Sequence, residues 1–200
     1  MTAVPLILAS SSSSRRMMLE AAGVLFTVIA PNVDEDAMTE RLEGKGAGAG
    51  DVADALAEAK AVAVSEQHGD ALVLGADQVL RCGEQLFNKA VDKIEAKATL
   101  LALRNTEHEL ISAAVLARGG VPIWRHSESA RLRMRDFSEP FLQDYLTAEV
   151  PDILGSVGCY RIEGRGAQLF ADVKGDQFCI RGLPLLAVLR ALRQFGALAS

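Results

Sequence analysis

Short apolar runs and helical stretches alternate along the first half of the chain. Strands are predicted at 5–9, 26–30 and 71–76, and the first and third of these runs are continuously apolar, as is typical of strands covered on both faces. Two stretches with helical character lie between them, at 17–22 and 51–67. Gly23 is expected to end the first helix and Asp51 to cap the second. This alternation predicts an α/β arrangement.

The second half of the chain is dominated by hairpin signals instead. Gly119-Gly120 is a two-glycine turn between strands expected at 109–116 and 121–134. Ser138 is expected to cap a helix and Pro184 to open another. The other predicted elements are strands at 78–80, 85–87, 159–162, 167–173 and 177–180, a turn at 175–176, and helices at 92–103, 138–148 and 184–194.

Together these elements predict a single domain over residues 1–200, built as a twisted mixed sheet flanked by helices. The length is sufficient for one well-cored domain with two lobes. The glycine-rich segment 43–50 is interpreted as a flexible surface loop. A dinucleotide-binding turn would need a strand before it, and a phosphate-binding P-loop would need a Gly-Lys-Ser/Thr end.

Composition indicates which kinds of binding partner the protein can have. The formal net charge is −5, which argues against a nucleic-acid partner, although a few local cations can still hold a small polyanion. No apolar run reaches the roughly 18–20 residues of a membrane helix, so no membrane partner is expected. The apolar run 5–9 is too short for the core of a signal peptide. Three widely spaced cysteines without a CxxC pair predict reduced thiols and a cytoplasmic location.

Candidate phosphate chemistry begins at the serines that follow the first predicted strand. Ser10 to Ser14 precede Arg15 and Arg16 at the start of a helix. Helix N-termini offer free N–H groups to anions, hydroxyls add donors, and guanidinium groups match phosphate oxygens. An ordinary serine-rich turn with two solvated arginines is the alternative, and the residues alone leave both interpretations open.

Carboxylates follow two of the predicted strands. Asp77 comes directly after 71–76, where an unpaired carboxylate is costly to desolvate, and Asp34 to Asp36 follow the second strand. Two such carboxylates could hold Mg²⁺ or Mn²⁺, or one could activate a water molecule. Lys60 and Lys89 are each either surface lysines or phosphate ligands. The histidines have no metal-ligand spacing.

The order of these features along nearly the whole chain resembles the Maf family of nucleotide pyrophosphatases. The resemblance rests on Leu6 to Ser10 with Ser12 and Arg15-Arg16, then Pro31 to Glu35, Ala59 to Ala61, Gly75 to Val79, Lys89, His108, Tyr160 to Gly164 and Gly182 to Leu185. It implies hydrolysis of a nucleoside triphosphate to the monophosphate and diphosphate with a divalent cation, in a Maf/ITPase-like fold with two lobes around a nucleotide cleft. It also implies a possible homodimer.

The resemblance assigns roles to individual residues. It implies that Asp77 and Glu35 are catalytic and hold the metal ion, and that one group of side chains binds the substrate phosphates: Ser10, Ser12, Arg15, Lys60 and Lys89. Whether Glu35 or Asp77 is the base or the metal ligand stays open.

Several positions depart from the common family pattern. Ser14, Gln78 and Glu163 stand where the dTTP/UTP-type subfamily has Arg, Thr and Gln, and they look like the subfamily that prefers 7-methyl-GTP. A carboxylate at Glu163 would accept hydrogen bonds from a guanine edge and favour the positive charge of an N7-methylated base. These three residues are therefore expected to set substrate specificity. The alternatives are a dTTP/UTP-type pyrophosphatase and a nucleotide-binding regulator of septum formation in cell division.

Overall fold

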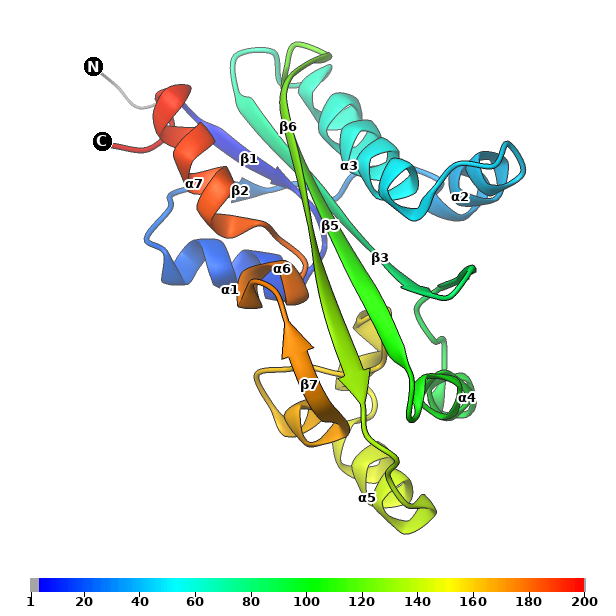
Figure 1. Ribbon diagram of the computed structural model, residues 1–200. Coiled ribbons are helices and arrows are strands. Elements are labelled where there is room, and N and C mark those ends of the chain that lie inside the picture. Colours follow the sequence, from blue (N-terminus) through cyan, green and yellow to red (C-terminus); the bar gives the residue numbers. More distant parts are fainter. Residues whose placement is uncertain (1–3, 200) are drawn as a thin grey trace.

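Seven strands form one mixed sheet in the computed structural model, which describes residues 4–199 (Figure 1). Six of them run in the order β2-β1-β3-β5-β6-β7, and β4 pairs with β3. The strands are β1 (Leu6–Ala9), β2 (Thr27–Val28), β3 (Leu72–Cys82), β4 (Gln85–Phe87), β5 (Glu107–Arg118), β6 (Val121–Met134) and β7 (Phe170–Lys174).

Strand direction divides the sheet as the sequence predicted. β1 is parallel to both β2 and β3, whereas β3, β5, β6 and β7 are joined by antiparallel pairings. Gly119 and Gly120 link β5 to β6 with φ angles of 55° and 79°. Two successive positive φ values are the requirement of a two-residue hairpin turn, so this predicted hairpin is confirmed.

The prediction that the third strand ends at Ala76 is wrong. β3 continues to Cys82 because β5 pairs with it without interruption from Val73 to Arg81. On its other side, β1 ends its pairing at Gly75 and β4 begins at Leu80. Among the described residues, positions 76–79 of β3 therefore have no strand partner on that side. Asp77 and Gln78 lie within this gap.

Helices cover both faces of the sheet and one of its ends (Figure 1). α3 lies on one face with α2 beside it, and α1, α6 and α7 lie on the opposite face, while α4 and α5 lie at the far end of the long strands. Their bounds are α1 (Ser13–Ala21), α2 (Glu35–Glu43), α3 (Ala49–Ser65), α4 (Lys93–Leu103), α5 (Glu139–Glu149), α6 (Gln177–Ile180) and α7 (Leu185–Gln194). No helix among residues 4–199 is long and apolar enough to cross a membrane.

Gly75 allows α3 to lie unusually close to β3. A Cβ atom at this position would stand 2.2 Å from the carbonyl oxygen of Ala57 and 2.6 Å from the amide nitrogen of Ala61. Both of those residues belong to α3 and flank Lys60. Since backbone atoms cannot move aside cheaply, only glycine fits here. The close approach places Lys60 directly beside Asp77, two residues further along β3.

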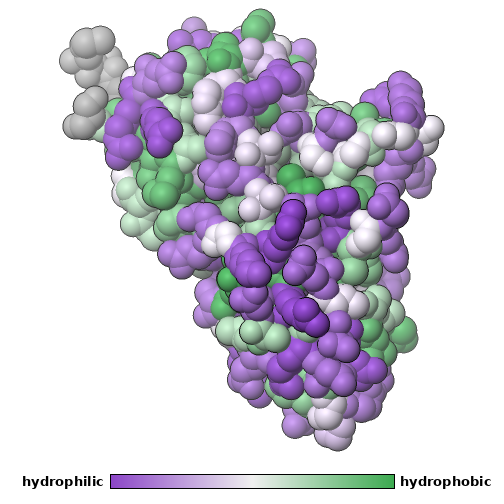
Figure 2. All heavy atoms as spheres, viewed as in Figure 1, coloured by the Kyte–Doolittle hydropathy of each residue, from purple (hydrophilic) through white to green (hydrophobic). Residues whose placement is uncertain are grey.

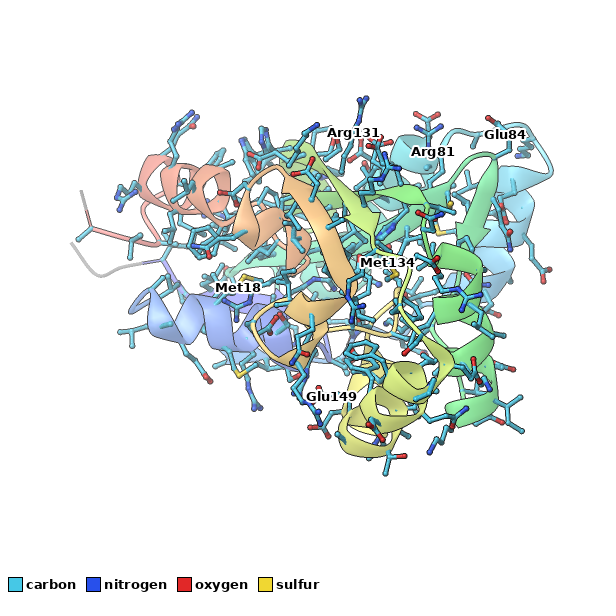
Figure 3. The ribbon with its side chains drawn as sticks, turned by 60° about the horizontal axis from the view of Figure 1, so that its bottom comes forward. Met18, Arg81, Glu84, Arg131, Met134 and Glu149 are labelled. Carbon is cyan, nitrogen blue, oxygen red and sulfur yellow. The ribbon has the colours of Figure 1, made fainter. Side chains whose placement is uncertain are left out.

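Alternation along β6 separates the interior from the surface. Arg131 is exposed and Met134 is fully buried. In Figure 3, Met134 lies inside the molecule, and Arg131 lies near Arg81 at the outer surface. The face seen in Figure 2 over β6 and β7 is largely hydrophilic. The period of two therefore sets which side of these strands packs against helices.

Two predicted strands of the C-terminal third do not form. Residues 159–162 are irregular and lie between the 3-10 helices Asp152–Gly155 and Arg165–Leu169. Residues 177–180 form α6 because Asp176 caps them: its Oδ1 accepts the N–H groups of Phe178 and Cys179. The strand predicted at 167–173 begins only at Phe170.

Two smaller expectations also need correction. The strand predicted at 26–30 is reduced to the two residues of β2. Asp51 does not occupy the N-cap position of α3, since the helix begins at Ala49 after Gly48. The Asp51 carboxylate instead accepts the Gly48 N–H at 3.1 Å, which still satisfies a free donor at the start of the helix.

Candidate functional site

A cavity of about 530 Å³ opens beside the gap in the sheet at β3. It lies between the serine-rich start of α1, the middle of β3 and the loops around 152–163 and 180–182. Every site residue predicted from the sequence lines it: Ser10, Ser12, Ser14, Arg15, Glu35, Lys60, Asp77, Gln78, Lys89 and Glu163. Residues that are far apart in the sequence therefore meet at one place.

Lys60 bridges the two predicted carboxylates. Its Nζ donates to Oδ1 of Asp77 at 2.6 Å and to Oε2 of Glu35 at 2.7 Å. The Lys60 side chain is only 5% exposed and that of Asp77 10%, whereas Glu35 is 42% exposed. An ammonium group is strongly stabilised between two carboxylates in a buried setting, where the effective dielectric is low. This contact makes Lys60 a fixed part of the site.

The donor set around Lys60 suits a hard divalent cation with few protein ligands. The ammonium contacts one oxygen of each carboxylate, so the second oxygen of each is available. Among residues 4–199, no three His, Cys, Asp or Glu side chains gather as a metal cluster. Mg²⁺ is commonly bound by one or two carboxylates together with waters and substrate phosphates. Glu35 and Asp77 fit that pattern.

The serine loop is organised around Ser12, which caps α1. Its hydroxyl accepts the Arg15 N–H at 3.4 Å. The hydroxyl of Ser10 accepts the N–H of Ser12 at 3.2 Å and Nη1 of Arg15 at 3.3 Å. In these contacts both hydroxyls act as acceptors, so each keeps its own O–H as a donor. The loop thus presents donors at a helix N-terminus, which favours an anion.

Arg15 is buried, with 8% of its surface exposed, although it carries a charge. Its Nε donates to the Gly182 carbonyl at 2.8 Å, which ties the start of α1 to the turn before α7. Burial lowers the pKa of Arg15 because it desolvates the guanidinium, while the charges of Asp77 and Glu35 oppose that change. Arginine nevertheless remains protonated in proteins. The site therefore contains two buried cations, Arg15 and Lys60.

Another part of the cavity wall is formed by backbone carbonyls and loop side chains. The hydroxyl of Ser14 donates to the Arg181 carbonyl at 3.0 Å. The amide of Gln78 donates to the carbonyls of Cys179 and Ile180 at 2.9 and 3.1 Å. Ser14 and Gln78 therefore hold the α6–α7 turn in place.

Glu163 makes a looser contact in this part of the cavity wall. It lies beside Arg181, which also lines the cavity, with Oε1 3.5 Å from Nε. This distance is longer than the contacts that Lys60 makes with Glu35 and Asp77.

Lys89 is the most exposed of the predicted cations. It follows β4 and also lines a second cavity of about 480 Å³, which shares Glu35, Asp77 and Gln78 with the first. Unlike Lys60, it makes no ion pair with the described residues. Its ammonium group is therefore placed at the mouth of the site and is free to contact a ligand.

Comparison with known proteins decides the family. A protein-family model described as "Maf-like protein" matches residues 5–195, which is nearly the whole chain. This chain belongs to the Maf-like protein family. The ordered motifs of the sequence had indicated the same family, and that prediction is confirmed.

Several relatives of this Maf-like protein are similar over their full length. A nucleoside triphosphate pyrophosphatase of Caulobacter vibrioides is 49% identical over 99% of both chains. One of Granulibacter bethesdensis is 48% identical over 96% of this chain and 98% of the relative. A 7-methyl-GTP pyrophosphatase of Rhizobium meliloti is 44% identical over 96% of this chain and 97% of the relative. A HAM1 protein from Coxiella burnetii has a TM-score of 0.45 over 67% of this chain and 74% of that one at 16% identity, a likeness too low to bear on function.

The Maf-like site contains three cavity residues that sequence reasoning did not single out as functional: Tyr160, Arg161 and Arg181. Arg161 lies 3.4 Å from both Glu149 and Asp152. Arg161 belongs to a segment predicted as a strand, and Arg181 lies between a predicted strand and a predicted helix, where an arginine is usually a solvated surface residue. No spacing signal could have placed them in the cavity, because their loops are shaped by tertiary contacts.

Tyr160 is fixed by a buried histidine. Its hydroxyl lies 2.8 Å from Nε2 of His108, which is 2% exposed. Burial lowers the pKa of His108 to about 4, so the imidazole is neutral near neutral pH. Burial likewise raises the pKa of Tyr160. The pair is a neutral hydrogen bond that holds one wall of the cavity in this Maf-like protein.

Proposed function

We propose that this Maf-like protein is a nucleoside triphosphate pyrophosphatase that releases a nucleoside monophosphate and diphosphate. Relatives with that name match it over nearly their entire length. The observation that carries the proposal is the Lys60 bridge between Glu35 and Asp77, which lies in the same cavity as the anion-binding serine loop. This arrangement combines groups that bind phosphate with groups that can activate water.

The substrate phosphates are assigned to the cationic end of the cavity. Ser10 and Ser12 donate through their hydroxyls, Arg15 adds charged N–H donors, and the N-terminus of α1 favours negative charge. Lys60 and Lys89 neutralise charge that develops on the leaving diphosphate. Because these groups are already in position, they need little reorganisation when the substrate binds.

Water activation is assigned to Asp77 with Glu35. A carboxylate beside the α-phosphorus accepts a proton as the water attacks, and the Lys60 ammonium offsets the negative charge of both carboxylates. The second oxygens of Glu35 and Asp77 would hold Mg²⁺ or Mn²⁺, which supplies acidification of a bound water and charge neutralisation on phosphate oxygens. This reaction requires no covalent intermediate on the protein.

The nucleoside is assigned to the part of the cavity that Ser14, Gln78 and Glu163 line, which we call the nucleoside end. This chain is similar both to relatives named nucleoside triphosphate pyrophosphatase and to relatives named 7-methyl-GTP pyrophosphatase. The carboxylate of Glu163 can accept hydrogen bonds from the N–H groups of a guanine edge. We therefore propose guanine nucleotides, including the N7-methylated form, among the substrates.

A triphosphate panel tests the proposal. Purified protein is given each common nucleoside triphosphate, 7-methyl-GTP, dTTP and UTP, and the release of diphosphate and of inorganic phosphate is measured separately. We expect diphosphate and monophosphate in equal amounts, loss of activity with a chelator, and recovery with Mg²⁺ or Mn²⁺. A clear preference for dTTP and UTP would instead indicate the pyrimidine-type enzyme.

The panel also tests the non-enzymatic alternative. A protein that binds triphosphates tightly but releases no diphosphate with either metal would contradict the proposal and favour a nucleotide-binding regulator of cell division. Asp36→Asn is a matched control for Glu35→Gln, because Asp36 adjoins Glu35 in α2 but does not line the first cavity. We expect the Glu35 variant alone to lose most of its turnover.

We also propose a cytoplasmic location and a homodimeric state. Three free cysteines support the first, since reduced thiols are usual in the cytosol. The second rests on the family resemblance alone. Fractionation of cells and light scattering of the purified protein would test them.

A further inference from the structure

Arg181 is held in place by its backbone at the end of the cavity assigned to the nucleoside. Its carbonyl accepts the Ser14 hydroxyl at 3.0 Å, and its N–H donates to the Gln177 carbonyl at 3.2 Å. The side chain lines the cavity and is 22% exposed. A substitution of this side chain therefore leaves the backbone contacts that position the turn unchanged.

The Arg181 side chain lies against Glu163. Its Nε is 3.5 Å from Oε1 of the carboxylate, whose side chain is 36% exposed. That Nε is a buried donor without a hydrogen-bond partner among the described residues. The contact is thus an ion pair rather than a well-formed hydrogen bond. Opposite charges face each other here, but the oxygens of Glu163 are not saturated with donors.

We propose that Arg181 is a specificity-determining residue whose charge cancels that of Glu163. The proposal rests on the proposed function, because it concerns the base of the same triphosphate substrate. A carboxylate alone would attract the positive charge of an N7-methylated guanine. With a guanidinium beside it, the pair has no net charge, and a cationic base gains little over a neutral one. Wild-type protein is therefore expected to use GTP and 7-methyl-GTP with similar efficiency.

Substitutions on the two sides of the pair should act in opposite directions. Arg181→Met leaves the carboxylate uncompensated, so it should raise the ratio of kcat/KM for 7-methyl-GTP over GTP. Glu163→Gln leaves the guanidinium uncompensated, so it should lower that ratio. Each change is expected to be on the order of fivefold, because the groups are partly exposed and screened. The double variant should return close to the wild-type ratio.

GTP and 7-methyl-GTP form a sharp substrate pair because they share the phosphates and the sugar. Effects of a variant on phosphate binding therefore cancel in the ratio. Specificity is a difference between two transition-state affinities, and only this ratio measures it. A charge effect must also shrink as ionic strength rises, whereas a change of cavity shape would not.

Two further variants serve as controls. Arg181→Lys keeps the charge and should keep the wild-type ratio. Arg161→Met removes a cation that lines the same cavity but pairs with Glu149 and Asp152 rather than Glu163. It should change the ratio less than the Arg181 variant does. Together the controls separate the charge next to Glu163 from any positive charge in the cavity.

The outcomes separate this proposal from the proposed function. Hydrolysis of GTP by the wild type supports the proposed function whatever the ratio is. If Arg181→Met hydrolyses GTP but its ratio is the same as that of the wild type or lower, the proposal for Arg181 is wrong. A strong preference of the wild type for 7-methyl-GTP also overturns the proposal. Should a variant hydrolyse too slowly, the ratio of dissociation constants for 7-methyl-GMP and GMP, measured by calorimetry, replaces the kinetic ratio. The same opposite shifts are expected, and equal ratios in all variants contradict the proposal.

Discussion

The two ends of the cavity are built differently. At the phosphate end, Lys60, Asp77 and Arg15 are all nearly buried, and contacts of 2.6 to 2.8 Å hold them. They come from a long strand and from helices that pack on it. At the nucleoside end, Glu163 and Arg181 stand on loops, are partly exposed and lie 3.5 Å apart. Because short, buried contacts resist displacement better than a long, partly exposed ion pair, we expect the first end to be rigid and the second to be adaptable.

This difference matches the two tasks of the proposed enzyme. A triphosphate has the same geometry whatever base it carries, so its groups can be fixed in advance where charge develops. The base varies between substrates, and discrimination depends on small differences in affinity. A loosely paired loop residue can be replaced without damaging the reaction centre. The two ends should therefore respond differently to substitution.

The largest effect is expected at the rigid end from Asp77→Asn. The amide keeps the shape but cannot accept a proton, so kcat should fall by about 10³-fold or more, with nucleotide affinity and folding largely retained. Steady-state kinetics and calorimetric binding check this. Asp152→Asn is the control, because it alters a cavity carboxylate near Arg161 instead and should change kcat only slightly. Near wild-type kcat in the Asp77 variant would exclude its catalytic role.

Gly75→Ala should disrupt the rigid end, because the added methyl group cannot be packed between β3 and α3. The new Cβ would meet the Ala57 carbonyl at 2.2 Å, which forces α3 and Lys60 away from β3. We expect a loss of about 3 kcal/mol in the free energy of unfolding, together with reduced turnover. Gly50→Ala in the same helix meets open space and should be neutral or slightly stabilising. Similar midpoints for both variants in urea unfolding would contradict this.

Arg15→Ala should weaken the binding of every triphosphate equally. Removing a charge-assisted contact costs roughly 2 kcal/mol, which is about a thirtyfold change in affinity. Because a phosphate contact reads no base, the kcat/KM values for a purine and a pyrimidine triphosphate should fall together. Kinetics with GTP and UTP measure both. A loss confined to one base would place Arg15 at the nucleoside end.

The smallest effect concerns His108, which fixes Tyr160 at the nucleoside end. Its pKa of about 4 in the folded protein is below the ordinary value of 6.5. The native state therefore binds fewer protons than the unfolded chain between these values, and stability falls as pH drops from about 6.5 to 4. Between pH 7 and pH 5, the free energy of unfolding should therefore fall by about 1 to 2 kcal/mol more in the wild type than in His108→Gln. Urea unfolding of both proteins at the two pH values checks this, and identical losses would refute it.

The sequence predicted the rigid end far better than the adaptable one. Apolar runs and helical periodicity located β1 and α3, and the serine loop was placed at the start of α1, because these signals are local. The continuation of β3 past Asp77 could not be predicted in this way, because it depends on pairing with β5, which is distant in the sequence. Both strands that failed to form, at 159–162 and 177–180, belong to the nucleoside end. Their conformation depends on capping by Asp176 and on tertiary contacts.

Contacts between side chains could not be predicted from the sequence either. Helical periodicity placed Lys60 in a helix, but only the close approach at Gly75 brings it between Asp77 and Glu35. The pairing of Glu163 with Arg181 likewise joins two loops that no pattern relates. Motif order could suggest which residues meet, whereas the packing of α3 and the loops determines how they meet.

Isotope transfer from solvent tests the central claim most directly, namely that the rigid end directs water at the α-phosphorus. GTP is hydrolysed in water enriched in oxygen-18, and both products are analysed by mass spectrometry. Attack at the α-phosphorus places one labelled oxygen in the nucleoside monophosphate and none in the diphosphate, and this is the result we predict. Label in the diphosphate, or release of inorganic phosphate with a nucleoside diphosphate, would contradict the account.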